Sequence, residues 1–323
     1  MRAVVATEHG GPEVLRMEER AQAVPGPGEV LVDVHAAGVN FMDTYLRRGM
    51  LMVVPPPFVP GVDGAGVVTA VGLGVDQAWV GQRVAWERVM GSYVSHLVVP
   101  VRQLVSVPQN VSLETAAAGL MQALTAHHLC HTAVDAGEGV VALVHSAASG
   151  VGRMLTQLIS HRGGTVIATV SQPAKAAIAE SAGAAAVIVR KDGADVADEV
   201  RRMTRGRGVD VVYDGTGRAS YQASISATAY GGTFVYFGQA GGPIPLLDLW
   251  GQPDGVRLMR SRGDAPDATP EQTAERARQV MSWLSDGTLE VVIGQRYPLS
   301  EASRAHADIE SQASVGKLLL LPG

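Results

Sequence analysis

Residues 140–152, VVALVHSAASGVG, carry the clearest chemical signature of the chain. Five apolar residues lead to His145, small residues follow, and RMLTQLISHRG then shows helical periodicity. A buried strand that turns through small residues into a helix is typical of a dinucleotide-binding βαβ unit. There the backbone approaches a pyrophosphate and the helix N-terminus offers free N–H groups. At the three glycine positions of G-x-G-x-x-G the chain has Ala147, Ser149 and Gly152, so the match is degraded and depends on its context.

The end of the next strand discriminates between NAD and NADP. An NAD site carries Asp or Glu about 20 residues beyond the glycines, where it binds the ribose diol. Here TVIATV ends in SQPAK (171–175), without an acid. Ser171 and Lys175, with Arg190 after the third strand, suit the additional phosphate of NADP, which a carboxylate would repel. The sequence therefore favours NADPH; the alternative is that these are ordinary surface residues beside a helix start.

Composition limits the class of protein. With 323 residues, 46% of them hydrophobic and 18% charged, the chain should form a compact globular protein of one or two domains. A net charge of −5 argues against nucleic acid or an anionic membrane as partner, and no apolar run reaches the ~20 residues of a membrane span. Cys130 is the only cysteine, which excludes intrachain disulfides and a cysteine-based structural zinc site. No signal-peptide pattern opens the chain, and we expect a cytoplasmic protein.

The residue pattern divides the chain into two regions. Short apolar runs separated by Gly and Pro turns predict a β-rich, partly open barrel over residues 1–110, with one helical turn after Asn40. A helix is expected from Ser112, as N-cap, to Val134. After Gly139, strands alternate with helices as in the doubly wound parallel sheet of a Rossmann domain. The tail, with a helix over 270–286 and two further strands, should fold back onto the first domain, and segment 261–270 is predicted to be the most mobile.

GVNFMDTYLRRG (38–49), HSAASGVG (145–152) and VYDGTG (212–217) resemble the zinc-independent quinone oxidoreductases of the medium-chain dehydrogenase/reductase superfamily. The resemblance covers nearly the whole chain, including FGQAGG (237–242) and the ending RYPLSEASRAHADIES. It implies a GroES-like β-barrel domain built from residues 1–122 and 264–323, with a Rossmann domain over 123–263 inserted in it. It also implies NADPH as cofactor and a homodimer joined through the edge strands of the Rossmann sheets, at VRLMR (256–260).

The resemblance also implies which residues act. It places Asn40 and Tyr45, from the family's N-F-x-D-x-Y motif, beside the nicotinamide and Arg260 in the substrate pocket, so these three are the candidate catalytic residues. The loop MLMVVPPPFVPG (50–61), with Trp86, Met90 and Trp250, suggests a wide hydrophobic pocket. The candidate cofactor-binding residues are Asn40, Thr125, Ala148, Ser149, Gly150, Val151, Gly152, Ser171, Lys175, Arg190, Gly215, Phe237, Gly238, Gln239, Gly316 and Lys317.

Metal and nucleophile chemistry is not favoured. Zinc alcohol dehydrogenases of the superfamily use a Cys and a Gly-His-Glu set, whereas the matching place here reads GVDG (61–64). His127 and His131 share one helix face but have no HExxH glutamate, which favours an ordinary surface or interface over a metal site. Cys130 lacks a CxxC or nucleophile motif and is expected to be a small buried or half-buried thiol, and no G-x-S-x-G elbow is present.

Three functions are consistent with these residues. The first is an NADPH-dependent reductase of quinones or similar conjugated carbonyls, in which Tyr45 donates to the developing oxyanion and Arg260 stabilises it. A purely structural Tyr45 is equally consistent. The second is an enoyl reductase acting on an activated C=C bond of a bulky apolar substrate. The third is an NADPH-binding protein without turnover.

Overall fold

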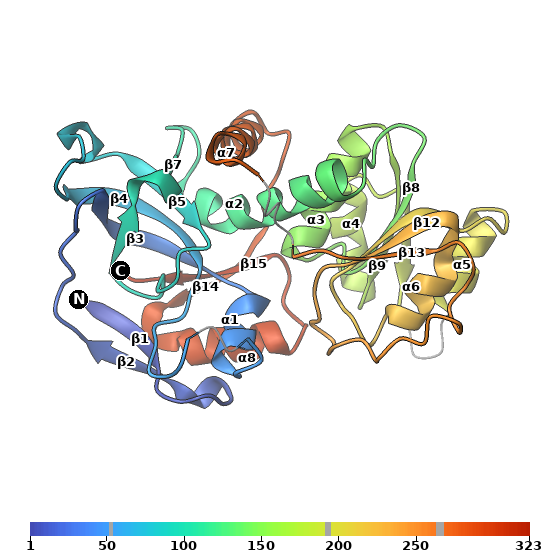
Figure 1. Ribbon diagram of the computed structural model, residues 1–323, viewed down its shortest axis with the longest axis horizontal. Coiled ribbons are helices and arrows are strands. Elements are labelled where there is room, and N and C mark those ends of the chain that lie inside the picture. The colour runs from blue at the N-terminus through green and yellow to red at the C-terminus, as the bar shows by residue number, and fades with distance from the viewer. Residues whose placement is uncertain (52–53, 191–194, 263–267) are drawn as a thin grey trace. The chain divides into compact units, whose positions relative to one another are not determined.

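Two compact units make up the chain, and the computed structural model describes residues 1–51, 54–190, 195–262 and 268–323. Unit 1 comprises Met1–Met121 and Pro270–Gly323, and unit 2 comprises Gln122–Thr269. Unit 2 is therefore an insertion, and both chain ends belong to unit 1 (Figure 1). Within the described residues, no helix has the length and apolar composition needed to cross a membrane.

Unit 1 is organised around β3 (Glu29–Val39), in which Val30, Val32 and Val34 are buried at alternate positions. The first residues of β3 pair with β6 and its last residues with β15, while β4 pairs along most of its length. The sheet order is β14-β15-β3-β4-β5-β7 with β6 also on β3, and the β14–β15 pair is parallel. The remaining strands of this sheet are β4 (Asp63–Val71), β5 (Arg83–Glu87), β6 (His96–Pro100), β7 (Val105–Ser106), β14 (Ile293–Pro298) and β15 (Lys317–Leu321).

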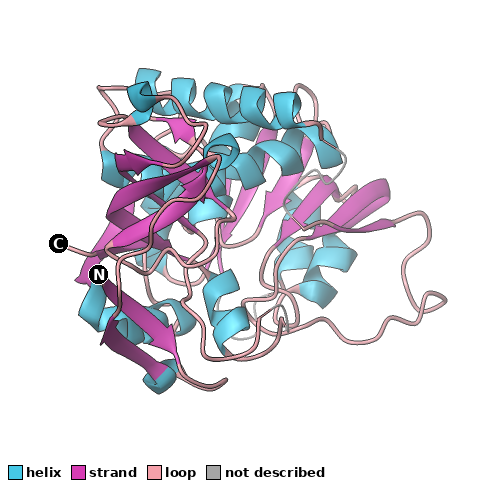
Figure 2. Ribbon diagram, turned by 60° about the vertical axis from the view of Figure 1, so that its left-hand side comes forward, coloured by secondary structure: helices cyan, strands magenta, loops and turns pink. Residues whose placement is uncertain are grey.

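Helices and a small ribbon complete unit 1. Helices α1 (Phe41–Arg47) and α8 (Ala302–Glu310) pack against each other, although they lie far apart in the sequence (Figure 1). Strands β1 (Arg2–Ala6) and β2 (Leu15–Glu19) form a separate antiparallel ribbon, below the N label in Figure 2. The unit also contains α7 (Pro270–Asp286), the first part of α2 (Leu113–His127), and the 3-10 turns η1 (Pro12–Val14), η2 (Gln77–Trp79), η3 (Val101–Gln103) and η6 (Leu299–Glu301).

Unit 2 is a six-stranded, fully parallel sheet in the order β10-β9-β8-β11-β12-β13. Chain order therefore reverses between β8 and β11, the switch point at which doubly wound sheets bind nucleotides. The strands are β8 (Val141–Val144), β9 (Thr165–Val170), β10 (Ala186–Val189), β11 (Val209–Asp214), β12 (Thr228–Tyr236) and β13 (Arg257–Arg260).

Helices cover both faces of this sheet: α3 and α4 lie on one face and α5 and α6 on the other (Figure 1). Their amphipathic faces bury residues such as Leu155 and Ile159 of α3 and Val200 of α5 against the strands. The helical elements are α3 (Gly150–His161), η5 (Pro173–Lys175), α4 (Ala176–Ser181), α5 (Val196–Met203), α6 (Tyr221–Ala227) and the π-helix η4 (His128–Ala133), which follows α2.

The predicted barrel and doubly wound sheet are both confirmed, and two details differ. The helical turn expected after Asn40 is a seven-residue helix, and the helix expected from Ser112 to Val134 changes from α to π at His128. Ser112 caps that helix as predicted, because its hydroxyl accepts from the Thr115 N–H at 3.0 Å. Of the segment 261–270 that the sequence predicts to be mobile, residues 263–267 lie outside the described residues, and Pro270 already begins α7.

Candidate functional site

The small-residue turn of unit 2 connects β8 to α3 at the switch point of the sheet. Gly152 lies so close to the turn that a Cβ atom there would be 2.3 Å from the Ser146 carbonyl oxygen, and so only glycine fits. Gly150 and Val151 begin the helix with N–H groups directed out of its N-terminus, and Ala147 and Ala148 are buried beneath. A dense cradle of backbone at a helix N-terminus is what a pyrophosphate requires.

Ser149 stands where the G-x-G-x-x-G pattern has its second glycine. Its backbone is extended (φ −84°, ψ 171°), a conformation that needs no glycine, and its hydroxyl accepts from the Gly152 N–H at 3.4 Å. The serine therefore acts as the N-cap of α3, which the sequence pattern does not reveal. It occupies one N–H group of the first turn and leaves those of Gly150 and Val151 for an anion.

A buried polar cluster fixes the other side of the switch point. The Asp214 carboxylate ends β11 and accepts from the N–H groups of Thr216 at 2.8 Å and Gly217 at 2.9 Å. Ser224 donates to Asp214 at 2.6 Å and lies 2.9 Å from His145 Nε2. Burial lowers the pKa of His145, although Asp214 opposes this, so the imidazole is neutral. No role for Asp214 or His145 was predicted from the sequence; the signal that could have marked the cluster is an acid between a buried strand and Gly-Thr-Gly.

Several of the predicted cofactor residues of unit 2 lie together beside this cluster. A Cβ on Gly215 would be 2.9 Å from the Phe237 ring, and one on Gly238 would be 2.9 Å from the Gly215 carbonyl oxygen. Gln239 accepts a hydrogen bond from Tyr236 at 3.1 Å. Arg260 pairs in register with Tyr236 at the end of β13, and its side chain is exposed.

Thr125 approaches the same region from α2. Its side chain is buried, and Gln122, one helical turn earlier, packs against Gly150 of the small-residue turn. The helix that carries Thr125 therefore contacts the turn through Gln122, while Gly215, Phe237 and Gly238 lie against one another beyond β11 and β12.

The candidate phosphate clamp lies at the carboxyl ends of β9 and β10, which are adjacent parallel strands. Ser171 follows β9, Lys175 ends η5, and the Arg190 N–H donates to the Val170 carbonyl at 2.8 Å. Burial lowers the pKa of Lys175, and the nearby Arg190 guanidinium lowers it further. The Arg190 Nε–H is buried and has no hydrogen-bond partner among the described residues. The two cations are desolvated and repel each other, and a bound anion would relieve that repulsion.

Unit 1 holds a second group of predicted residues. The Asn40 side chain donates to Asp63 at 2.8 Å, and the Lys317 ammonium donates to Asp63 at 3.1 Å. All three side chains are at most 7% exposed. Gly316, just before Lys317, has φ +66°, and a Cβ there would lie 2.2 Å from the Val292 carbonyl oxygen. Sequence reasoning named Asn40 and Lys317 separately and treated Asp63 only as a position without a zinc ligand.

Tyr45 lies on α1 with a half-buried side chain, and its ring contacts that of Phe41 at a centroid distance of 6.3 Å. Trp86, expected to line a pocket, has no exposed surface: it is part of the unit 1 core, and its indole N–H donates to Ser92 at 2.9 Å. The pocket prediction is therefore wrong for Trp86, because a pocket wall must be accessible from the pocket. In unit 2, by contrast, Trp250 is 98% exposed.

The histidine pair is arranged as its spacing predicts. The rings of His127 and His131 stack with centroids 4.2 Å apart, and Cys130 between them is buried, as expected. Burial raises the pKa of the Cys130 thiol to about 12, so the thiol is unreactive at neutral pH. No group of three or more metal-ligating side chains occurs in the described part of the chain. The absence of a catalytic metal remains a prediction.

Comparisons with known proteins identify both units. Residues 26–109 match the family described as alcohol dehydrogenase GroES-like domain, and residues 150–271 match that described as zinc-binding dehydrogenase. A quinone oxidoreductase of Salmonella typhimurium is 35% identical over 98% of both chains, and a 2-haloacrylate reductase of a Burkholderia species is 34% identical over 99% of this chain and 98% of that protein. The crystal structure of Escherichia coli quinone oxidoreductase complexed with NADPH superposes with a TM-score of 0.95, at 32% identity and full coverage of both chains. The chain belongs to the quinone oxidoreductase family of the medium-chain dehydrogenase/reductase superfamily.

Proposed function

We propose that this protein is an NADPH-dependent oxidoreductase that transfers hydride to a quinone or a similar conjugated carbonyl. The observation that carries the choice of cofactor is the Lys175–Arg190 pair, two desolvated cations where an NAD enzyme would have a carboxylate. The cradle at Gly152 suits the pyrophosphate, because glycine there lets the backbone approach. The solved relative in complex with NADPH, and the relatives named quinone oxidoreductases, support the same assignment.

The residues of the chain bind and orient rather than react covalently. NADPH, when bound, supplies the hydride. Ser171, Lys175 and Arg190 would hold its 2′-phosphate, and the N-terminus of α3 its pyrophosphate. From unit 1 we assign two contributions to the reaction: the Tyr45 hydroxyl donates to the acceptor oxygen, and the Lys317 ammonium, held by Asn40 and Asp63, adds a fixed positive charge. We assign to Arg260 a stabilising role toward the anion.

A second candidate is reduction of an activated C=C bond, because a relative that is 34% identical is named 2-haloacrylate reductase. Both reactions place negative charge on a conjugated oxygen, so the same donors serve either. An NADPH-binding protein without turnover is the third candidate, and it differs from the others only in what the acceptor assay shows.

We infer a homodimer joined through β13, the edge of the unit 2 sheet, where Leu258 is 36% exposed. An unpaired edge strand with an accessible aliphatic side chain can continue the sheet into a second copy. We place the enzyme in the cytoplasm, and its partners are a small conjugated substrate and this second copy.

The deciding experiment follows NADPH oxidation by the purified protein with quinones and conjugated enones in parallel. Rapid turnover of quinones with slower enones is expected. Turnover of enones alone would replace the proposal with the C=C reductase. Tight NADPH binding without oxidation by any acceptor would favour the non-catalytic role, and equal use of NADH would overturn the cofactor assignment.

A further inference from the structure

Four completely buried polar side chains of unit 1 lead away from Asn40 in an unbroken line. Asp43 and Arg47 come from α1, Tyr93 from the segment before β6, and His306 from α8. None of these four side chains has any exposed surface. Tyr93 Oη lies 3.1 Å from Asp43 Oδ2 and 3.0 Å from His306 Nε2, and Arg47 Nη1 lies 3.1 Å from His306 Nδ1. Buried polar groups of this number stay satisfied only as a connected network.

The direction of every hydrogen bond in the line is fixed by chemistry. Arginine has no acceptor atom, so His306 Nδ1 must accept from Arg47. Burial, with Arg47 adding to it, lowers the pKa of His306 to about 3, and the neutral ring therefore carries its proton on Nε2. That N–H donates to Tyr93 Oη, which leaves the Tyr93 hydroxyl proton for Asp43 Oδ2. The line is thus a one-way chain from Arg47 to Asp43.

The outer end of the chain is anchored at the surface. Arg47 donates to Glu310 at 2.7 Å and to the Gly10 carbonyl at 3.1 Å, beside an open depression of about 550 Å³. Because an arginine does not release its proton, the chain cannot carry protons inward from this depression. Its function must be to hold groups in place.

The inner end holds Asn40. Asp43 Oδ2 accepts from the Asn40 backbone N–H at 2.8 Å as well as from Tyr93, whereas Oδ1 has no hydrogen-bond partner among the described residues. Burial raises the pKa of Asp43 to about 7, and Asp63 adds to this; the Asn40 N–H, Lys317 and the Tyr93 hydroxyl lower it. The charged groups around Asp43 are therefore Asp63 on β4, Lys317 on β15 and Arg47 on its own helix, with neutral His306 beyond Tyr93.

We propose that Tyr93, His306 and Arg47 are positioning residues, which act through Asp43 to fix Asn40, and with it the Lys317 ammonium, in the arrangement that substrate reduction requires. This inference rests on the function proposed above. Asn40 holds Lys317 by its amide oxygen and Asp63 by its amide nitrogen, so a shift of Asn40 displaces the ammonium. The carboxylate form of Asp43 maintains the arrangement, because the two hydrogen bonds that Oδ2 accepts are stronger to an anion than to a neutral carboxyl group.

Tyr93→Phe tests the chain, since it removes one hydroxyl and keeps the ring. We expect kcat to fall about tenfold while KM for NADPH changes less than about threefold, as for a lost hydrogen bond to a charged group. The acid limb of the pH profile of kcat should move about one pH unit upward, because the Asp43 anion loses a stabilising donor and its pKa rises. A merely structural tyrosine would lower stability without moving that limb.

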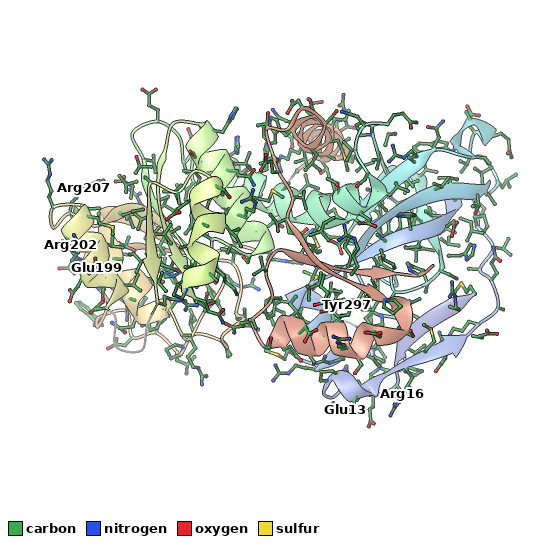
Figure 3. The ribbon with its side chains drawn as sticks, turned by 180° about the vertical axis from the view of Figure 1, so that it is seen from behind. Glu13, Arg16, Glu199, Arg202, Arg207 and Tyr297 are labelled. Atoms are coloured by element: carbon green, nitrogen blue, oxygen red, sulfur yellow. The ribbon has the colours of Figure 1, made fainter. Side chains whose placement is uncertain are left out.

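Two comparisons sharpen the test. Tyr297→Phe is the matched control, because Tyr297 is a buried tyrosine of the same unit (Figure 3). Its hydroxyl donates to Asp308 at 2.6 Å and takes no part in the hydrogen-bond chain from Arg47 to Asp43. The Tyr297→Phe variant should be less stable than the wild type, and the acid limb of its pH profile of kcat should stay in place. His306→Gln retains an N–H near the Nε2 position, so it should keep more of kcat than His306→Leu, which donates nothing.

The ¹³C carboxyl resonance of Asp43, followed over pH in wild type and Tyr93→Phe, separates this inference from the proposed function. A higher pKa in the variant supports the chain even if no quinone is reduced, in which case only the proposed function fails. An unchanged Asp43 titration, or an acid limb that stays in place while the wild type reduces quinones, overturns the chain alone. If Tyr93→Phe does not fold, the two His306 variants decide in the same assays, and equal kcat losses overturn the proposal.

Discussion

The Lys317 ammonium donates to the amide oxygen of Asn40 at 2.5 Å, across 277 residues of sequence. Asp63 accepts from both residues, so the three side chains form a closed ring inside unit 1. In the Lys317–Asp63 ion pair neither side chain is more than 4% exposed. Removing one partner of such a buried pair is strongly destabilising, because the other charge is left without compensation. The ring brings together β15, β4 and the start of α1, and it keeps a positive charge on a side chain with little freedom to move.

Lys317→Met should separate the structural from the chemical contribution of this ring. Removal of the ammonium leaves Asp63 buried without a counter-charge, and we expect the free energy of unfolding to fall by about 3–5 kcal/mol. Adding Asp63→Asn should restore much of that stability, because the remaining groups are neutral. Urea denaturation measures the first effect and quinone turnover the second. Recovery of kcat together with stability in the double variant would refute a role for the charge in the reaction.

Lys175→Ala should weaken the binding of NADPH far more than the binding of NADH. Loss of one charge-assisted hydrogen bond to the 2′-phosphate is expected to raise Kd for NADPH about 10- to 100-fold and to change Kd for NADH less than about twofold. Fluorescence titration of each cofactor measures both values. Arg202→Ala is the control, because Arg202 is an exposed cation of the same unit that pairs with Glu199 on α5 (Figure 3). Equal losses for both cofactors would exclude Lys175 as a phosphate ligand.

The elements that the sequence predicts well are those that local pattern determines. The apolar runs that became β8, β9, β10 and β11 and the small residues before Gly152 carry their periodicity within a few residues. The N-cap at Ser112 was equally local. Ser149 shows the limit of motif comparison, because a serine in place of a glycine acquires a capping function that only the backbone geometry reveals.

Long-range polar contacts could not be predicted in this way. Lys317 and Asp63 are 254 residues apart, and Tyr93 and His306 are 213 apart, so no window of sequence contains either pair. Asp43 was visible only as one letter of the N-F-x-D-x-Y motif, and its partner Tyr93 had no motif of its own. Trp86 misled for a related reason: an aromatic residue near a pocket loop has the same sequence signature whether it lines the pocket or fills the core.

His306→Gln should flatten the pH dependence of stability in the acid range. The ordinary histidine pKa of 6.5 is lowered to about 3 in the folded protein, so between these values the unfolded chain binds more protons than the folded one. The free energy of unfolding therefore falls as pH decreases through this window, by up to about 1.4 kcal/mol per pH unit from this group. Glutamine does not titrate, and urea denaturation at several pH values should show a smaller slope. A slope equal to that of the wild type would mean that His306 is protonated in the folded state.

Leu258→Asp tests the proposed dimer. Leu258 lies on β13 at the open edge of the unit 2 sheet, and a carboxylate there would be buried against the second copy without a partner. We expect the dissociation constant of the dimer to rise about 100-fold or more, measured by sedimentation velocity over a range of concentrations. Val24→Asp in unit 1 is the control, since Val24 is 84% exposed and lies outside the proposed interface. A wild-type chain that sediments as a monomer, or equal weakening by both substitutions, would exclude pairing through β13. Dissociation with normal NADPH affinity would show that the cofactor site of unit 2 is complete within one copy.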